Sequence, residues 1–184
     1  MRVKLFLYVL LAVIIVIATF LGVKSFTKDD NIDIKEYIPQ EEISEEQERQ
    51  TLVTLYFQNI QNKDIMPEAR LIDVKLLLNN PYETLAKLLL DGPKSDKLKS
   101  VIPEGTKLLD AKVNGNTAVV NFSTEFVKSV NLGKEEEEKI IDSIVNTLTE
   151  LNEIDSVKIL IEGKEGECFE DKAVEFTESF VRKN

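Results

Sequence analysis

The chain has 184 residues, of which 33 are acidic and 23 basic, and its formal net charge is −10. It contains no His, no Trp and one Cys, Cys168. These facts exclude Ser-His-Asp and Cys-His catalysis, the usual zinc sites built on imidazole, and an intrachain disulfide. The acidic surplus also disfavours nucleic acid and anionic lipid head groups as partners, because both are bound through Lys and Arg.

Residues 5–23, LFLYVLLAVIIVIATFLGV, form a run of 19 residues without a charge. A helix of this length spans roughly 28 Å, which matches a hydrocarbon core of about 30 Å. Arg2 and Lys4 precede the run, so the positive-inside bias places the N-terminus in the cytoplasm and the rest of the chain outside. A cleaved signal peptide would have a shorter apolar core and an Ala-x-Ala-like site, and a lipoprotein would need a Cys directly after the run. We therefore expect an uncleaved single-pass anchor from Leu5 to Val23, in a segment 1–24.

Residues 25–50 carry nine carboxylates against Lys28, Lys35 and Arg49. Few apolar residues interrupt this segment, and Pro39 breaks any helix across its middle. The composition predicts an acidic, partly disordered tether that lifts the folded part away from the membrane. Residues 41–50 could instead form a polar helix that leads into the domain.

Two strands are predicted at the start of the folded part. Residues 51–57 alternate apolar and polar side chains, which is typical of a half-buried strand, and a polar turn over 59–64 follows. Residues 69–77 form the second strand candidate. Its residues on one side are Arg70, Ile72, Val74 and Leu76.

A helix with clear start and stop signals follows. Asn80 is placed to cap it, Pro81 suits its first position, and Glu83 is placed to close a capping box. Gly92-Pro93 ends the helix, because Gly adopts the left-handed cap and Pro cannot continue. Three leucines form its expected buried stripe: Leu85, Leu88 and Leu89.

Three more elements complete the expected core. Asn114-Gly115 joins two short strands, 107–113 and 117–122, in a predicted hairpin. Residues 134–151 have apolar side chains at three- and four-residue spacing, which predicts a helix. Residues 157–161 alternate again and predict a closing strand.

The last segment, residues 165–184, leaves two interpretations open. Its apolar side chains recur at helical spacing, which slightly favours a docked C-terminal helix, while an extended tail is the alternative. These side chains are Phe169, Ala173, Phe176 and Phe180.

The predicted order of elements is β-β-α-β-β-α-β in a single domain, residues 51–164. Strands mixed with two amphipathic helices indicate an α+β fold, here a two-layer α/β sandwich with one sheet covered on one face by helices. The anchor and tether precede this domain, and residues 165–184 extend it.

Seven short motifs in this order and spacing resemble the GerMN domain family of sporulation and spore germination proteins. The resemblance covers roughly residues 52–163. The motifs are Val53–Phe57, Met66–Arg70, Leu88–Pro93, Val101–Thr106, Asn121–Ser123, Val145–Glu150 and Val157–Gly163.

The resemblance implies a non-catalytic extracytoplasmic module that binds or assembles with envelope or sporulation proteins. Self-association at the membrane is one form that this assembly can take. Its fold is similar to the ring-building motif of sporulation channel components. The chain differs from the best-known member, which looks like a lipoprotein with two such units, because it has one unit and a transmembrane anchor. The resemblance implies no cofactor, metal or catalytic residue.

Six residues stand out as candidates. Glu68 and Arg70 flank the start of the second predicted strand. On a strand, residues two apart point the same way, so the two form either a structural ion pair or a partner-facing contact. Four further residues are structural positions of the family pattern: Gly92, Pro93, Pro103 and Gly105.

Alternative functions remain open at this stage. A module that binds a cell-wall or small-molecule component would need a hydrophobic concave pocket. A peptidoglycan hydrolase would need two carboxylates at a suitable separation, which 33 acidic residues supply easily. The run Glu135–Glu138 resembles a calcium-binding acidic cluster, but carboxylates are also favoured in the first turn of a helix, and we interpret it as a solvated helix start.

Overall fold

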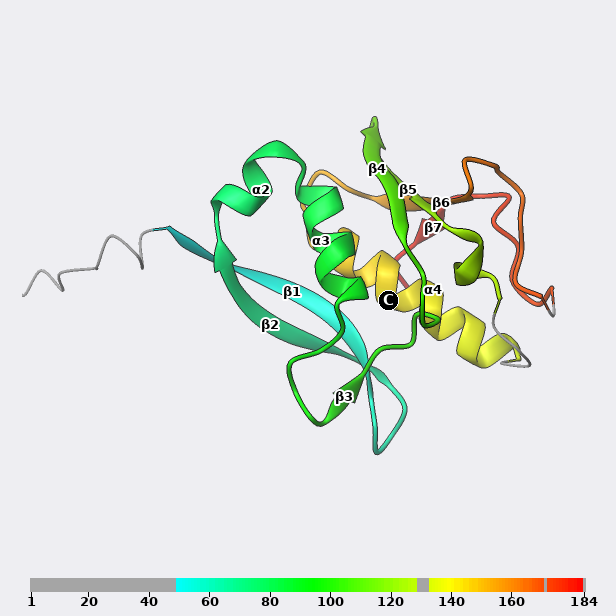
Figure 1. The fold of residues 1–184 in the computed structure, drawn as a ribbon, viewed down its shortest axis with the longest axis horizontal. Helices are drawn as coiled ribbons and strands as arrows, with labels where there is room; N and C mark the ends of the chain where they lie inside the picture. The colour runs from blue at the N-terminus through cyan, green and yellow to red at the C-terminus, as the bar shows by residue number, and fades with distance from the viewer. Residues whose placement is uncertain (1–48, 129–132, 171, 184) are drawn as a thin grey trace, which may run out of the picture. The chain divides into compact units, whose positions relative to one another are not determined.

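The computed structural model describes residues 49–128, 133–170 and 172–183 (Figure 1). The expected anchor and nearly all of the expected tether lie outside these residues. Within the described part of the chain, no helix is long and apolar enough to cross a membrane.

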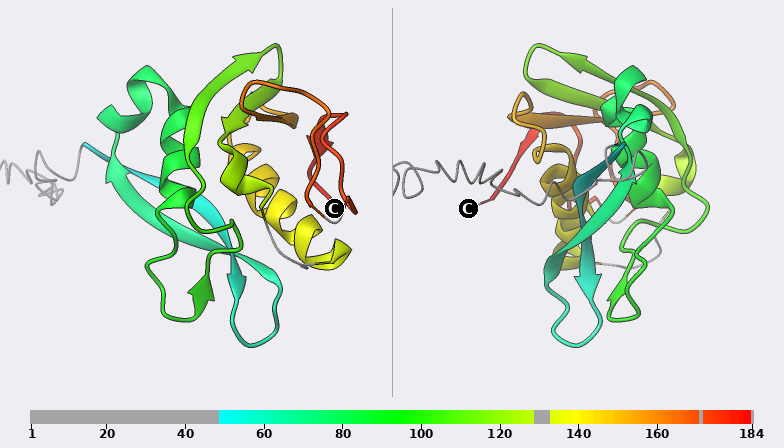
Figure 2. Two further views of the ribbon diagram at one scale, coloured as in Figure 1. Left: turned by 45° about the vertical axis from the view of Figure 1, so that its right-hand side comes forward. Right: turned by 90° about the vertical axis from the view of Figure 1, so that its left-hand side faces the viewer.

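The strands form two sheets rather than the one that the sequence predicts (Figures 1 and 2). A three-stranded antiparallel sheet has the order β2-β1-β3, and a four-stranded sheet has the order β4-β5-β6-β7, in which β5 and β6 are parallel. The strands are β1 (Gln50–Asn59), β2 (Ile65–Asp73), β3 (Leu98–Lys99), β4 (Leu108–Asn114), β5 (Thr117–Phe122), β6 (Ser156–Ile161) and β7 (Phe180–Val181). The mixed α+β class is confirmed, whereas the single covered sheet is wrong.

The second predicted strand is displaced along the chain. It begins earlier than expected and ends at Asp73, and residues Lys75–Asn79 form a short helix, α2. The Asp73 carboxylate accepts a hydrogen bond from the Lys75 backbone N–H at 2.9 Å, which turns the chain out of the sheet. Val74 and Leu76 therefore do not share a strand face with Arg70, as the alternation suggested.

Helix α3 (Pro81–Leu90) starts as predicted. Asn80 Oδ1 accepts the Glu83 backbone N–H at 3.0 Å, and Pro81 occupies the first turn. Asn80 Nδ2 donates to the Ala111 carbonyl at 2.7 Å, so the same side chain also ties the helix to β4. Gly92, with φ +83°, follows the end of the helix. Leu85 and Leu89 are buried, and Leu88 is partly buried.

Helix α4 (Lys134–Leu148) packs against both sheets, because it contacts β1 of one and β6 of the other. Its apolar face belongs to one continuous core that also includes side chains of α3, β1 and β5. The helix is three residues shorter at its C-terminus than predicted. The predicted hairpin of β4 and β5 and the closing strand β6 are confirmed.

The C-terminal segment contains no helix in its described residues, so the slightly favoured helix is wrong. Phe169 and Phe176 are fully buried and lie against Phe126 of the 3-10 turn η1 (Thr124–Phe126), with ring centroids 5.4 and 5.9 Å away. The strand β7 then pairs with β6. The two rings meet one neighbour because a chain reversal brings Cys168 opposite Glu175, an arrangement that helical spacing cannot reveal.

Candidate functional site

Arg70 on β2 connects two of the family motifs. Its guanidinium forms an ion pair with Glu68 and donates to the Leu88 and Gly92 carbonyls at 3.4 and 3.0 Å. These carbonyls lie in the last turn of α3 and just beyond it, where the helix dipole favours a positive charge. The Arg70 side chain is 5% exposed and lies 5.9 Å from the centroid of the Phe57 ring.

Glu68 holds the chain immediately after the helix. Its Oε2 accepts the backbone N–H groups of Lys94 and Ser95, each at 2.9 Å. Burial acts to raise the pKa of Glu68, but the hydrogen bonds from Arg70, Ser95 and Lys94 lower it below the ordinary value of 4.5. We call Glu68, Arg70 and the segment that they hold, residues 88–95, the strand–helix clamp.

The other family positions also shape turns. Pro93 follows Gly92 within the strand–helix clamp. Further on, the Pro103 carbonyl accepts both the backbone N–H and the hydroxyl of Thr106, at 3.3 and 2.7 Å, while Gly105 adopts φ +82°. A side chain at Gly105 would be strained by this left-handed conformation. All six candidate residues therefore lie in two local arrangements, and their described contacts are internal to the domain.

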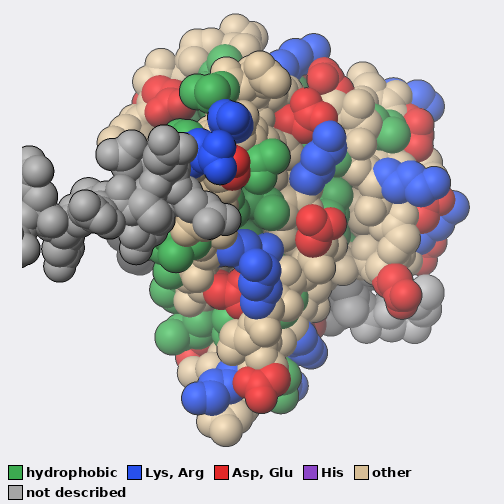
Figure 3. Space-filling view, turned by 60° about the vertical axis from the view of Figure 1, so that its left-hand side comes forward, with side chains coloured by type: hydrophobic (Ala, Val, Ile, Leu, Met, Phe, Trp, Pro, Cys, Tyr) green, Lys and Arg blue, Asp and Glu red, His purple; other side chains and the backbone are tan. Residues whose placement is uncertain are grey.

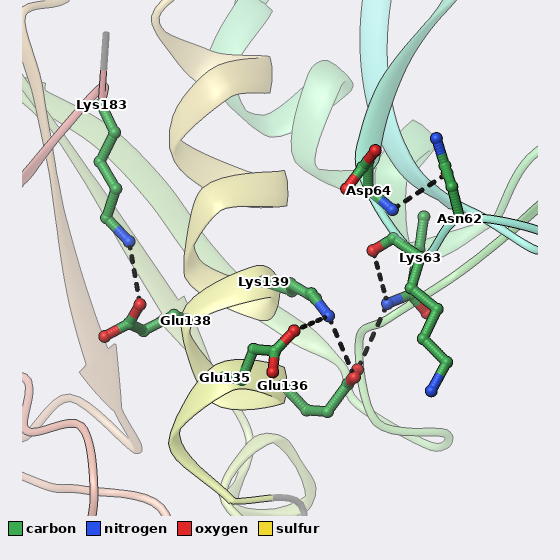
Figure 4. Close-up of polar contacts among 9 residues, drawn as sticks. Asn62, Lys63, Asp64, Glu135, Glu136, Glu138, Lys139 and Lys183 are labelled. Atoms are coloured by element: carbon green, nitrogen blue, oxygen red, sulfur yellow. Dashed lines mark hydrogen bonds and ion pairs between the residues drawn. The ribbon is translucent and has the colours of Figure 1, made fainter.

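A polar network surrounds the start of α4 (Figure 4). Lys139 donates to Glu135 at 2.8 Å and to Glu136 at 3.2 Å, and the buried Gln58 donates to Glu136 at 3.3 Å. Glu137 is fully buried, which corrects the expectation that the whole acidic run is solvated. Among the described residues, no group of three or more Cys, Asp and Glu side chains is arranged to hold a metal ion.

A second cluster joins three distant parts of the chain. Glu150 Oε1 accepts the Tyr56 hydroxyl at 2.8 Å and Arg182 Nη1 at 2.7 Å, and the Arg182 guanidinium lies 5.1 Å from the centre of the Tyr56 ring. Burial and the hydrogen bond to Glu150 raise the pKa of Tyr56. Tyr56 and Glu150 lie in two of the family motifs, but no motif linked them to each other or to Arg182, because the bonded residues are 94 and 32 positions apart.

A cavity of about 300 Å³ lies between α4 and the C-terminal segment. Ile141, Val174 and Phe180 supply apolar lining, and charged side chains border it. Lys183 of the C-terminal segment reaches Glu138 at 3.4 Å and Asp142 at 3.2 Å on α4, and the first of these contacts is drawn in Figure 4. The cavity is at the lower end of the size range of small-molecule sites.

One strand edge is left partly uncovered. The backbone N–H and carbonyl of Tyr56 are bound by Thr147 Oγ1 at 3.0 Å and by Ser143 Oγ at 2.6 Å, both on α4. Gln58 pairs with β3. Backbone groups alternate in direction along a strand, so those of Leu52 and Thr54 also face away from β2, and no described residue binds them. We call this stretch the open edge of β1.

The opposite edge of the hairpin, on β2, has a different character. Pro67 is paired with Tyr56, so it lies at a position whose backbone faces outward. Proline has no N–H to offer, and natural sheets use it to block edge pairing. The open edge of β1 contains no proline, so Leu52 and Thr54 both keep an N–H that an added strand could bind.

Together these features define a mixed α+β domain whose motif residues serve the fold and whose surface offers a strand edge and a small cavity. Comparison with known proteins agrees with this class. A family model described as sporulation and spore germination matches residues 54–167. The chain therefore belongs to this family, the GerMN domain family.

The spore germination protein GerM of Bacillus subtilis (strain 168) is 40% identical over 88 residues, which is 45% of this chain and 23% of that protein. The chain thus spans about a quarter of the length of this relative. The solved first GerMN domain of the sporulation protein GerM from Bacillus subtilis has a TM-score of 0.59 and 25% identity, covering 73% of this chain and 99% of that one. The tandem GerMN domains of the same protein give a TM-score of 0.59 at 23% identity, covering 74% and 47%.

Proposed function

We propose that this chain is a membrane-anchored, non-catalytic module that binds or assembles with other cell-envelope proteins during sporulation or spore germination. The family and the names of its relatives support a role in sporulation or spore germination. The open edge of β1 carries the binding role, because an extended segment of a partner can pair with its unbound backbone groups.

A pair of proline substitutions tests the open edge. Thr54 and Ala69 lie directly opposite each other, and the backbone of each faces away from the other strand. Thr54→Pro removes an N–H from the open edge, whereas Ala69→Pro removes one from the β2 edge that Pro67 already interrupts. Neither change removes a bond between β1 and β2.

The expected readout is co-purification of partners with the full chain from cross-linked envelope fractions of sporulating cells. Thr54→Pro should lose the partners that the wild type and Ala69→Pro retain. Equal retention by both variants, at equal amounts of folded protein in the membrane, would show that the open edge is not the binding surface.

The anchor is a separate part of the proposal, supported by the uncharged run Leu5 to Val23. It places residues 25–184 outside the cytoplasmic membrane. Protease added to intact protoplasts should then remove the domain and leave a membrane-embedded fragment. Protection of the domain from added protease would contradict this orientation.

A ligand-binding module for a wall or small-molecule component is the second candidate, and the cavity beside α4 favours it. Val174→Trp would fill this cavity without touching the open edge. If the cavity is the functional site, Val174→Trp should abolish calorimetric binding of soluble wall fragments while partner recovery in the proline experiment is unchanged.

Two-carboxylate hydrolysis of peptidoglycan is the weakest of the three alternatives. Such an enzyme needs a carboxylic acid whose pKa is raised. Among the described residues, four Glu side chains have a pKa below the ordinary value of 4.5, which does not suit the acid role: Glu68, Glu125, Glu136 and Glu150. Release of reducing sugar from purified wall by the domain would overturn the non-catalytic proposal.

A further inference from the structure

Four exposed leucines lie at one end of the described domain. Leu52 on β1 is 63% exposed, Leu71 on β2 is 61% exposed, and Leu76 and Leu78 on α2 are 53% and 73% exposed. Single exposed leucines are common on soluble proteins, but a group of them at one end of a domain calls for a partner surface. We call these four residues the N-terminal apolar patch.

The backbone places Leu52 beside Leu71, and α2 with Leu76 and Leu78 follows β2 directly in the chain. Leu52 and Leu71 are directly opposite in the β1–β2 hairpin and form a pair without backbone bonds between them, in which side chains approach closely. They occupy the sheet face away from the buried Val53 and Leu55. Helix α2 begins two residues after β2 ends, next to the start of β1 (Figure 1).

Helix α2 presents its leucines in two directions. Leu77 packs against the core, while its neighbours Leu76 and Leu78 are exposed on either side of it. Figure 3 shows hydrophobic and basic side chains gathered around the point where the described chain begins. Arg49 is the first described residue and Lys75 is the first residue of α2, so both adjoin the patch.

We infer that the N-terminal apolar patch rests on the outer surface of the bilayer that anchors the chain, with its leucines at the boundary of head groups and acyl chains. This inference depends on the proposed anchor. The chain enters the domain at Arg49, three residues before Leu52, and only 25 residues separate Val23 from Arg49. The tether therefore keeps this end of the domain near the membrane at a high effective concentration, so a weak contact is sufficient.

The composition of the patch favours lipid over a protein partner. Binding hot spots between proteins are rich in Trp, Tyr and Arg, whereas Leu is under-represented in them. Leucines bordered by Arg and Lys are typical of segments that lie in the membrane interface. The net charge of −10 opposes recruitment of the protein from solution by anionic lipid, but a tethered domain needs no such recruitment.

Docking in this way has a consequence for the proposed assembly. Leu52 belongs both to the patch, through its side chain, and to the open edge of β1, through its backbone. A docked domain holds the open edge next to the membrane surface, where other anchored proteins can reach it. The patch thus provides orientation and the open edge provides pairing.

Lipid-dependent fluorescence quenching in the full chain tests the inference. In a Cys168→Ser background, Leu78→Cys or Leu71→Cys carries an environment-sensitive nitrobenzoxadiazole label, and Leu109→Cys on β4, an exposed leucine outside the patch, is the matched control. The protein is reconstituted in phosphatidylcholine vesicles with and without phosphatidylglycerol, and nitroxide-labelled lipid is added as quencher.

Labels at positions 78 and 71 should be blue-shifted and quenched several-fold more strongly than the label at 109, in both lipid mixtures. Equal, weak quenching at all three positions overturns the inference. A blue shift at 78 without lipid quenching also overturns it and indicates a protein partner or a second copy instead. If alkaline carbonate extracts the reconstituted chain from the vesicles, the proposed transmembrane anchor is wrong. This result is distinct from weak quenching, which contradicts only the lipid contact of the patch.

Discussion

The central strands of the two sheets have the same burial pattern but different neighbours. Val53, Leu55 and Phe57 of β1 alternate with less buried residues, and so do Ala118, Val120 and Phe122 of β5. Strand β5 is paired along its whole length with β4 on one side and β6 on the other. Strand β1 is paired throughout only with β2, and β3 covers two of its residues on the other side.

This difference shows which structural property can be inferred from the alternation of apolar and polar residues along a strand. A period of two residues identifies the face that is buried, whereas the pairing of each edge depends on distant segments. The fully paired strand β5 should act mainly as a stabilising element. The half-paired strand β1 should combine a buried face with a surface for interaction.

The largest expected effect comes from the fully paired strand. Phe122 is buried and its ring stacks on Phe126 at a centroid distance of 4.7 Å, so Phe122→Ala should lower the free energy of unfolding by about 3–5 kcal/mol. Leu52→Ser, on the exposed face of β1, should change it by less than about 0.5 kcal/mol. Urea unfolding of residues 50–184 measures both values. If both variants lose a similar free energy of unfolding, β1 and β5 do not differ in their contribution to stability as proposed.

A second prediction concerns the helix that joins the two sheets. Leu148 of α4 is fully buried, so Leu148→Ala should cost about 2–5 kcal/mol. This measurement also requires that residues 50–184 fold without the anchor, as expected for a chain that buries one continuous core. Leu151, just past the end of α4, is only partly buried, so Leu151→Ala should lower the free energy of unfolding by less than Leu148→Ala does. A loss below roughly 0.5 kcal/mol at Leu148 would mean that this side of α4 is exposed in solution.

Much of the local structure could be predicted because its signals are local. Asn80 and Pro81 start α3, Gly92 follows its end, and Asn114-Gly115 lies at the β4–β5 turn, as expected from residues close in sequence. The division into two sheets could not be predicted, since it depends on which distant edges pair. The turn at Asp73 was missed because a single side-chain hydrogen bond overrides an apolar alternation that continues past it.

The candidate residues follow the same rule. Glu68 and Arg70 could be selected from the sequence, and their two-residue spacing predicts a shared strand face, but their partners at Leu88, Gly92 and Ser95 depend on the packing of α3 against β2. Tyr56 and Glu150 belong to two family motifs, but nothing in the sequence linked them to each other or to Arg182. Residues 165–184 were misread because the spacing of their phenylalanines fits a helix as well as a hairpin-like loop.

The strand–helix clamp gives a smaller, pH-dependent prediction. The pKa of Glu68 is lowered in the folded chain, so its ionised form stabilises the fold above the ordinary value of 4.5, and this contribution is lost as pH falls through the lowered pKa. Glu68→Gln should therefore cost about 1.5–3 kcal/mol at pH 7, the range for hydrogen bonds to a charged group. The difference from wild type should narrow below about pH 4.5, as followed by urea unfolding at several pH values.

Asp110 provides the control for the clamp. It lies 3.8 Å from Lys112 on β4, and both side chains are more than half exposed, so Asp110→Asn should change stability by less than about 0.5 kcal/mol. A constant difference between wild type and Glu68→Gln from pH 7 to pH 3 would contradict an ionic role for Glu68. If Glu68→Gln and Asp110→Asn change the free energy of unfolding equally, the ion pair of the clamp contributes no more than an exposed surface pair.

The smallest expected effect is on self-association. It tests whether the open edge of β1 can pair two copies of the domain without the membrane. Residues 50–184 carry 24 acidic and 17 basic side chains, so identical copies repel each other in solution. The open edge offers the backbone groups of a few residues, Leu52 and Thr54 among them. We therefore expect this fragment to sediment as a monomer at micromolar concentration in low salt. Salt at 1 M shortens the Debye length to about 3 Å and should ease the repulsion, so any weak association should appear there first and be absent in Thr54→Pro. A stable ring in dilute low-salt buffer would contradict this expectation and make the chain a scaffold subunit whose assembly needs no membrane.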